Sequence, residues 1–234
     1  MVSPAGGPLV DPASVPDWLA ALVRGTAGLT SGDLGWIPAP RGDGGRAAAV
    51  LVLFAQDTDG GAPDVLLQLR SEGLPSHAGQ VSFPGGAMDD VDDGPVAAAL
   101  REAAEEVGVR AGDVRPVATL PELYLPPSGF LVTPVLGHWE RPGPVAPVDP
   151  AETAAVARVP VPVLSDPANR LIVRGPSGSA YPGFVVPRML VWGFTGGLLD
   201  VLLAMGGWER PWRPAVEYDV DTAWGLADRT EVIR

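Results

Sequence analysis

One short segment, residues 94–108, limits the fold of this 234-residue chain more than any other part of it. Gly94-Pro95 favours a helix start, because proline suits the first helical position. Gly108 stands where helices commonly end in the left-handed conformation. Between these ends, apolar residues recur at helical spacing: Val96, Leu100, Ala103 and Val107. The segment therefore predicts a helix of defined length with one face directed towards a core.

Three glutamates crowd the C-terminal half of this predicted helix. Glu102, Glu105 and Glu106 stand in i, i+3, i+4 relation, so we expect their side chains to converge on one stripe. Like charges at this spacing repel each other by roughly 0.2–0.5 kcal/mol per pair, which favours a cationic partner. Divalent cations such as Mg²⁺ or Mn²⁺ prefer carboxylate oxygens, and the adjacent Arg101 can orient one of the carboxylates. The stripe thus indicates a metal site rather than an ordinary solvated acidic face.

Composition excludes several classes of protein. The chain has 16 arginines, no lysine and 28 acidic residues, and its net charge of −12 argues against a broad nucleic-acid surface. The absence of cysteine excludes disulfides, thiolate zinc sites and a cysteine nucleophile. The chain has no signal segment and no apolar run of roughly 18 residues, so we expect a cytoplasmic protein with no membrane partner. An anionic substrate would be repelled unless metals and local arginines reverse the field at the site.

Strand-like segments on both sides of the acidic helix predict an α/β fold. We expect strands at residues 46–56, 65–70, 114–120, 131–139 and 152–159, and a hairpin from 170–174 and 183–186. Further helices are expected at 15–24 and 188–205, each of which either closes the core or contacts a second copy in a homodimer. No linker divides the chain, so we expect one domain over residues 1–234. Its core spans about 46–212, with peripheral tails at 1–14 and 215–234.

The segment from residue 86 to residue 109 resembles the Nudix box. Its general form is Gly, five residues, Glu, seven residues, Arg-Glu, an aliphatic, any residue, Glu-Glu, any residue, Gly and an aliphatic. The second half is matched by Arg101, Glu102, Glu105, Glu106, Gly108 and Val109. The stretch between Gly86 and Arg101 is one residue longer than in the general box. The early glutamate is replaced by either Asp92 or Asp93.

The segment that precedes the box is equally informative. Residues 66–86 read LLQLRSEGLPSHAGQVSFPGG and closely resemble the segment before the box in coenzyme A pyrophosphatases, where it is associated with substrate recognition. Residues 120–134 and 191–199 also resemble this subfamily. The resemblance covers residues 46–212 and implies a Nudix-type α/β/α sandwich around a mixed β-sheet. It also implies metal-dependent cleavage of the pyrophosphate bond of coenzyme A or acyl-CoA, to 3′,5′-ADP and 4′-phosphopantetheine or its acyl derivative.

The resemblance also implies catalytic roles for residues of the box. Glu102, Glu105 and Glu106 are expected to bind Mg²⁺ or Mn²⁺, and Arg101 is expected to hold Glu102 in place. The metal would neutralise the pyrophosphate and activate the attacking water. The general base is either Glu102 or Glu152, which lies in a segment beyond the box.

Other residues are candidates for substrate binding. Arg70 ends a predicted strand, where its guanidinium can clamp a phosphate or pair with a box carboxylate. The amides of Gly85 and Gly86 either face a phosphate or simply form a tight turn. The remaining candidates for substrate binding are Ser71, His77, Gln80, Tyr124 and Ser128. By contrast, His138 lies within a predicted strand and is expected to be structural.

Two alternative functions remain at this point. The first is a Nudix pyrophosphatase for another nucleoside diphosphate derivative, such as an ADP-sugar, a dinucleotide or a nucleoside triphosphate. The second is a catalytically silent Nudix module that binds a ligand. The segment before the box argues against the first alternative, and the intact set of box glutamates argues against the second.

Overall fold

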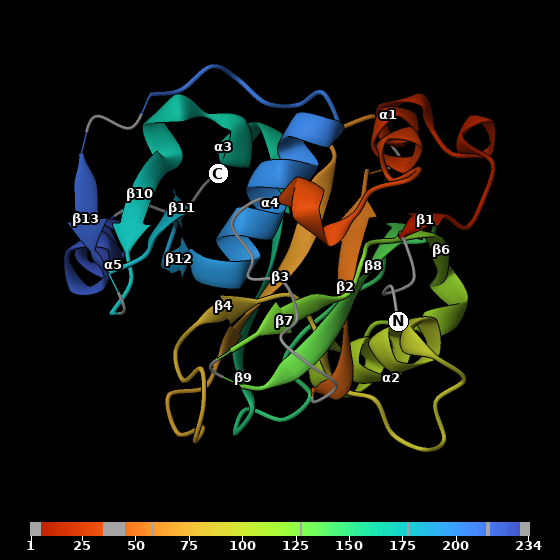
Figure 1. The fold of residues 1–234 in the computed structure, drawn as a ribbon, viewed down its shortest axis with the longest axis horizontal. Coiled ribbons are helices and arrows are strands. Elements are labelled where there is room, and N and C mark those ends of the chain that lie inside the picture. The colour runs from red at the N-terminus through yellow and green to blue at the C-terminus, as the bar shows by residue number, and fades with distance from the viewer. Residues whose placement is uncertain are drawn as a thin grey trace.

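The computed structural model of the chain describes residues 6–34, 45–57, 59–126, 128–176, 178–213 and 216–229. Within these ranges, a nine-stranded mixed sheet carries helices on both faces, and a second sheet of four strands lies beside it (Figure 1). The expected α/β class and the sandwich of helices around a mixed sheet are therefore confirmed.

The first sheet is built around two long, nearly continuous apolar strands. Its strands are β1 (Gly7–Pro8), β2 (Arg46–Ala55), β3 (Asp64–Arg70), β4 (Val81–Ser82), β5 (Gly85–Ala87), β6 (Val114–Thr119), β7 (Leu123–Leu125), β8 (Phe130–Trp139) and β9 (Thr153–Pro160). Their order is β1-β6-β8-β2-β3-β4, with β5 beside β2, β7 beside β8 and β9 beside β3. The central pair, β2 and β8, is parallel, as expected for strands that are buried on both faces. The strands that the sequence predicts in this region are all present.

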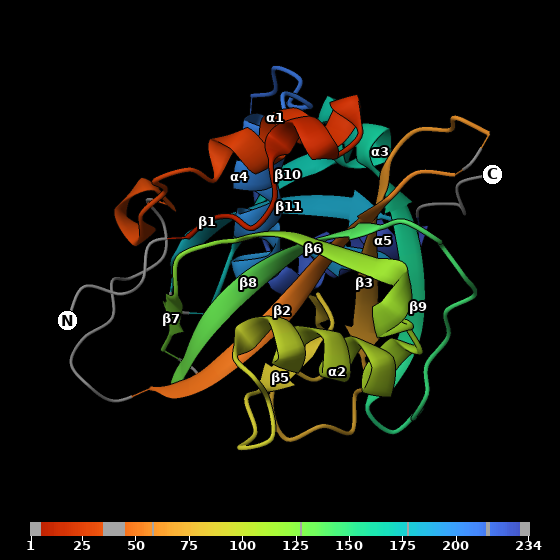
Figure 2. The same ribbon diagram turned by 90° about the vertical axis from the view of Figure 1, so that its right-hand side faces the viewer.

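The two faces of the sheet belong to two different cores. The main helices are α1 (Asp17–Gly25), α2 (Pro95–Val107) and α4 (Gly193–Met205), with a shorter α3 (Val161–Ser165) and single turns at Pro12–Ser14, Ser31–Leu34, Ala111–Asp113 and Pro167–Asn169. Along β2, Leu51 and Leu53 face the core beneath α2, whereas Val52 and Phe54 face the core beneath α1 and α4. Figure 2 shows α2 on one side of the sheet and α1 and α4 on the other. None of the helices in the described ranges combines the length and apolar character needed to cross a bilayer.

Helices α1 and α4 close the core. The apolar stripe of α1, which includes Leu19 and Leu22, packs into the same cluster as Leu198 and Leu202 of α4. All four side chains are fully buried. The apolar faces of both helices are thus used within the chain.

The C-terminal part differs from the prediction in two places. Residues 188–205 do not form one helix: β12 (Met189–Val191) comes first, and α4 starts at Gly193, whose φ of 62° turns the chain. Residues 217–229, which fall in the predicted peripheral tail, form β13 (Glu217–Asp219) and α5 (Val220–Arg229). In the predicted N-terminal tail, β1 pairs with β6. Residues 1–5 and 230–234 of the two predicted tails lie outside the described ranges.

The second sheet has the order β12-β11-β10-β13, with β10 at Arg170–Arg174 and β11 at Ala180–Val186. The predicted hairpin is present as the antiparallel pair β10–β11. Helix α5 covers this sheet through Ala223 and Ala227, which are fully buried with Val173 and Leu190. Small side chains at this spacing let the helix approach the strands closely, which the tail's composition alone does not indicate.

A buried arginine connects this sheet to α4. The side chain of Arg170 has no exposed surface and lies between the rings of Phe184 and Trp212, whose centroids are 4.5 and 4.3 Å from its guanidinium carbon. It is paired with Asp200 of α4, which is 31% exposed. The Nε and Nη1 atoms of Arg170 are buried without a hydrogen-bond partner. The aspartate therefore supplies the close counter-charge for a desolvated cation.

We predict that breaking this pair from the two sides has unequal effects. Asp200→Asn leaves a buried charge without its counter-charge and should lower the free energy of unfolding by about 3 kcal/mol. Arg170→Met removes the charge and leaves a carboxylate that water reaches, so its effect should stay within about 1 kcal/mol. Urea denaturation at pH 7 measures both, with the exposed Asp228→Asn as control. Equal losses from both substitutions would contradict the argument.

His138 has the structural role expected from its place in a strand. It lies on β8, and its ring meets that of Trp18 edge-on at 5.7 Å, while its Nδ1 is buried without a partner. Burial lowers the pKa of His138 below its ordinary value. The unfolded chain consequently takes up a proton at a higher pH than the folded protein does.

We therefore predict an acid-sensitive contribution to stability from His138. Because its pKa is lowered by folding, this contribution is present above about pH 6.5 and declines as the pH falls below that value. In thermal denaturation between pH 7.5 and 5.5, the wild type should lose stability relative to His138→Gln. The difference between the two proteins cancels the titration of the carboxylates. A difference that does not change with pH would show that burial of His138 has no such effect.

Candidate functional site

Helix α2 carries the acidic residues and has the predicted ends. It starts at Pro95 after Gly94, whose φ is 85°, and ends at Gly108, whose φ is 75°. The amide of Gly108 bonds back to the helix, as in a left-handed C-terminal cap. The helix packs against β2 and β5 (Figure 2), and its last turn lies beside Gly85 of β5, whose amide donates to Glu106. The turn that the sequence predicts at Gly85 and Gly86 is thus a short strand.

Glu106 is a buried carboxylate of the box, with 7% of its surface exposed. Its Oε2 accepts hydrogen bonds from Gln68 Nε2 at 2.7 Å and from the amide of Gly85 at 2.9 Å. Its Oε1 lies 3.4 Å from Nη1 of Arg70. Burial raises the pKa of Glu106 despite these donors, and the negative charge of Glu102 adds to the effect. The site therefore holds negative charge that its own donors do not fully compensate.

Arg101 organises the other carboxylates. Its Nε and Nη2 form a two-pronged pair with Asp92, at 3.0 Å to Oδ1 and 2.8 Å to Oδ2. Its Nη1 donates to Glu102 Oε1 and Glu105 Oε2, each at 3.0 Å. Arg101 lowers the pKa of Asp92, and that pair raises the pKa of Arg101. Of the two candidates for the early box position, Asp92 is the one that contacts the box arginine.

The carboxylate of Glu102 lies directly against the backbone of Gly86. A Cβ on Gly86 would lie 2.6 Å from Glu102 Oε1, closer than real side chains tolerate. The Glu102 side chain is 17% exposed, and burial raises its pKa. The missing side chain at Gly86 thus leaves room for the carboxylate of Glu102 in its present position, and Gly86 belongs to strand β5 where the sequence predicted a turn.

The three glutamates do not converge as predicted. Glu105 is 60% exposed and bonded to Arg101, whereas Glu106 turns towards the sheet. In the part of the chain that the structure describes, no three acidic or histidine side chains are grouped closely enough to hold a metal ion. The donors themselves suit a hard cation, because Glu102 and Glu106 are carboxylates whose charge burial leaves under-compensated. The carboxylates therefore have the chemistry that a divalent ion requires, and Glu102 and Glu106 are the two that best meet this requirement.

Two predicted phosphate contacts are engaged within the protein instead. Arg70 contacts Glu106, which is the alternative role considered for it from the sequence. The amide of Gly85 donates to the same carboxylate. Both groups from the segment before the box consequently meet the box at a single residue.

Ser71 holds a loop and is not an open binding group. It is buried, and its hydroxyl donates to the carbonyl of Pro150 at 2.6 Å. Its amide donates to the carbonyl of Glu152 at 2.9 Å. Glu152 is exposed on the turn that follows. Ser71 therefore anchors the loop that carries Glu152, which the sequence pattern did not indicate.

The remaining candidates lie in two other places. His77 and Gln80 brace each other in the loop before β4, with Nδ1 and Oε1 3.0 Å apart, and His77 has a φ of 54°. Tyr124 belongs to β7 and Ser128 follows it; Ser128 donates to the carbonyl of Leu125 at 3.4 Å. Strands β8 and β2 lie between β7 and β5. The structure thus separates Tyr124 and Ser128 from β5 by two strands.

Two buried polar residues of the site were not found from the sequence. Gln68 is fully buried on β3 and contacts Glu106, and Thr153 Oγ1 donates to Gln68 Oε1 at 3.0 Å. The available signal was a single glutamine within the apolar run VLLQL of β3. A buried side-chain amide is expected to have hydrogen-bond partners, so this glutamine predicted a polar neighbour.

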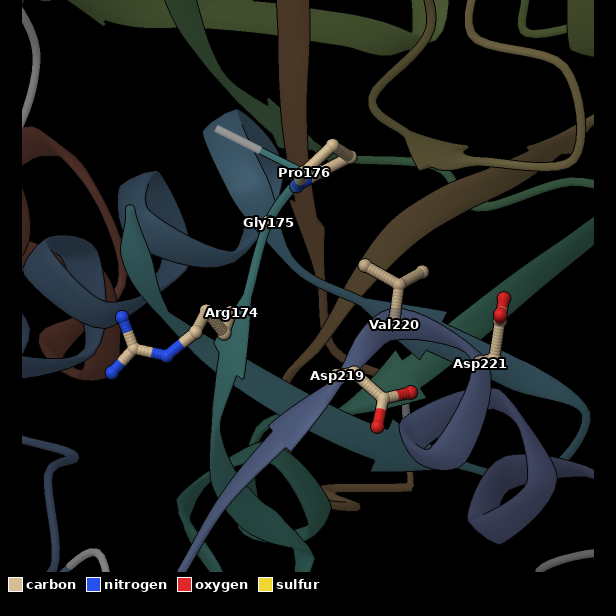
Figure 3. Close-up of a pocket in the computed structure, with 6 residues that line it drawn as sticks. All are labelled: Arg174, Gly175, Pro176, Asp219, Val220 and Asp221. Atoms are coloured by element: carbon tan, nitrogen blue, oxygen red, sulfur yellow. The ribbon is translucent and has the colours of Figure 1, made fainter. Parts of the chain in front are cut away.

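A separate pocket lies on the second sheet, away from α2 (Figures 1 and 3). Its volume is about 380 Å³, and it is lined by Arg174, Gly175, Pro176, Asp219, Val220 and Asp221. Asp219 caps α5 by accepting the amide of Thr222 at 2.8 Å. The aspartates of this pocket thus serve the helix end, and none of the box residues reaches it.

Part of the chain matches the model of a known protein family. A family model described as NUDIX domain matches residues 45–177. Proteins of Escherichia fergusonii and Escherichia coli K12, both described as uncharacterized Nudix hydrolase NudL, are 47% identical over 92 residues, or 39% of this chain and 46% of theirs. The matched region thus spans about half the length of these relatives.

Solved structures of Nudix proteins are also similar. A Nudix hydrolase of Mycobacterium smegmatis, RenU, is 30% identical over 54% of this chain and 80% of its own, with a TM-score of 0.41. A Caenorhabditis elegans Ap4A hydrolase is 22% identical over 50% of this chain and 80% of its own, with a TM-score of 0.40.

The geometry at Arg101 predicts unequal roles for two neighbouring aspartates. Asp92→Asn weakens the two-pronged pair and should lower the melting temperature at pH 7, because Arg101 then lacks its main counter-charge. Asp93→Asn, one residue away, is the matched control and should melt like the wild type. Differential scanning calorimetry measures both. A larger loss for the Asp93 variant would reverse the assignment of the early box position.

Proposed function

This chain belongs to the Nudix family, and from that premise we propose that it hydrolyses the pyrophosphate bond of coenzyme A or its thioesters. The products would be 3′,5′-ADP and 4′-phosphopantetheine or its acyl derivative. One observation carries the proposal: Arg70 and Gly85, from the segment that resembles coenzyme A pyrophosphatases, both contact the box residue Glu106. The two sequence signatures thus meet in one site.

The box residues would hold the metal in this proposal. A bound Mg²⁺ or Mn²⁺ supplies positive charge and Lewis-acid stabilisation of the charge that develops on the phosphate oxygens. Glu102 and Glu106 provide the buried carboxylates, and the more exposed Glu105 completes the set. Arg101 keeps Glu102 against the Gly86 backbone, which limits the positions that this carboxylate can take.

Arginine side chains would help to balance the negative charge of the substrate phosphates. The chain carries a net charge of −12, so a diphosphate needs local positive charge to approach. Arg70 is 23% exposed beside Glu106, where its guanidinium can turn from the long contact with that carboxylate to a phosphate oxygen. His77, Gln80, Tyr124 and Ser128 are proposed to contact the remainder of the substrate.

The general base is Glu102 or Glu152 in this proposal. Glu102 lies inside the acidic site and accepts a hydrogen bond from Arg101, which favours its charged form. Glu152 is exposed on a loop whose backbone is anchored by Ser71. Glu102 would remove the proton from water at its position inside the site. Glu152 would do so by approaching the substrate from its loop.

Product analysis with coenzyme A tests the substrate class. The purified protein is incubated with Mg²⁺, Mn²⁺ or EDTA, with an ADP-sugar, NADH and dNTPs as parallel substrates. We expect 3′,5′-ADP only when metal is present, with the fastest turnover for coenzyme A. Faster turnover of another diphosphate would replace the substrate assignment, and no turnover of any would favour a silent binding module.

Replacement of Glu106 tests the catalytic assignment. Glu106→Gln keeps an oxygen that can accept from Gln68 and Gly85 but removes the charge, so the protein should remain folded. Turnover of coenzyme A should fall at least about 100-fold. Glu140→Gln is the control, because Glu140 is exposed and directly follows β8, and this variant should retain activity. Near-normal turnover by the Glu106 variant would contradict the assignment of Glu106 as a metal ligand.

A further inference from the structure

We propose that Thr153 and Gln68 form a relay of hydrogen bonds that positions Glu106 and connects it to the loop carrying Glu152. This inference rests on the proposed function, in which Glu106 is a metal ligand. Thr153 and Gln68 are positioning residues here, because they act on the reaction through Glu106.

The amide of Gln68 is used at both ends. Its side chain has no exposed surface, and its Nε2 donates to Glu106 Oε2 at 2.7 Å and to Ser82 Oγ at 3.3 Å. Its Oε1 accepts the hydroxyl of Thr153 at 3.0 Å. Because the carboxylate of Glu106 can only accept, it requires the NH₂ end of Gln68, and the carbonyl end is left for the hydroxyl of Thr153. Glu106 therefore sets which way round the amide of Gln68 lies, and Thr153 holds the other end of that amide in place.

A β-bulge turns Thr153 towards this face of the sheet. β3 and β9 pair regularly from Asp64 with Pro160 to Leu69 with Ala155, and then shift so that Arg70 pairs with Thr153. Without the shift, Ala154 would oppose Arg70, and Thr153 would point to the opposite core. The extra residue in β9 thus places a hydroxyl beside Gln68, and bulges commonly re-aim side chains in this way.

The same bulge is continuous with the loop of Glu152. Thr153 directly follows Glu152, and the amides of both residues donate to the carbonyl of Asp149 at 2.9 and 3.0 Å. Ser71 adds bonds to Pro150 and Glu152 from the other side. Thr153 has 1% of its surface exposed, so the end of the loop is tied into the interior. A displacement of the loop is thereby transmitted to Gln68.

The relay leaves one carboxylate oxygen available. Oε2 of Glu106 accepts two N–H donors, from Gln68 and Gly85, whereas Oε1 has, among the residues that the structure describes, only the 3.4 Å contact with Arg70. The short bonds hold Oε2 in place against the sheet and leave Oε1 with the longer contact. Ligands that are held by outer hydrogen bonds typically lose about 10- to 100-fold in metal affinity or activity when those bonds are removed.

A double-mutant cycle tests the relay. The variants are Thr153→Val and Gln68→Leu, which nearly keep the side-chain volumes, alone and together. Thr133→Val, a buried threonine on β8, and Gln56→Leu, directly after the end of β2, are the controls. Each protein is measured for its melting temperature without metal, its affinity for Mn²⁺ by titration calorimetry, and its kcat and KM with coenzyme A.

We expect Thr153→Val to weaken Mn²⁺ binding and lower kcat about tenfold, with KM nearly unchanged. Gln68→Leu should lower both by about 100-fold, and the double variant should equal Gln68→Leu, because Thr153 acts through Gln68. Additive losses would overturn the relay, and so would wild-type Mn²⁺ affinity and kcat in Thr153→Val, a comparison that stands even if the Gln68 variant does not fold. If the wild type hydrolyses no diphosphate, the proposed function fails, while the Mn²⁺ cycle still decides the relay.

Discussion

The rest of the site depends on the burial of one carboxylate, that of Glu106. A desolvated charge is tolerated only where hydrogen bonds and opposite charge surround it. Gln68 and Arg70 from β3, with Gly85 from β5, provide those contacts and thereby tie the last turn of α2 to the sheet. The geometry of helix, turn and strand is therefore coupled at this point, and a change in any of them alters the environment of the carboxylate.

Arg101 has the corresponding role on the solvent side of the helix. Its guanidinium joins the connecting segment, through Asp92 and the carbonyl of Ala87, to two carboxylates of the helix. A planar group with five donors can hold this many acceptors in fixed directions, which an ammonium group cannot do. One cation thus limits the repulsion of a cluster in a chain that is already strongly acidic.

Local patterns predicted the elements of the fold well where turn residues and periodicity agree. The helix from Pro95 to Val107 has the expected glycine ends, and the strands of the first sheet are present. The prediction was wrong where these signals were mixed. The apolar run before Gly193 was read as helix although it pairs as β12, and α5 was overlooked although it buries Ala223 and Ala227 against the second sheet. Burial against a neighbouring strand decided both cases, and a single sequence does not display that neighbour.

The sequence by itself determined the family motif, the limits of the acidic helix and the presence of compensating arginines, because each follows from residues close together in the chain. Only the tertiary structure decided which partners they take. In the structure Arg101 pairs with Asp92, and Arg70 contacts Glu106. Ser71 is buried and donates to the carbonyl of Pro150. The tertiary structure also brought Thr153 to Gln68 across 85 positions of sequence, through a bulge in β9. Pairing register between distant strands sets such contacts, and it arises from the packing of the whole sheet.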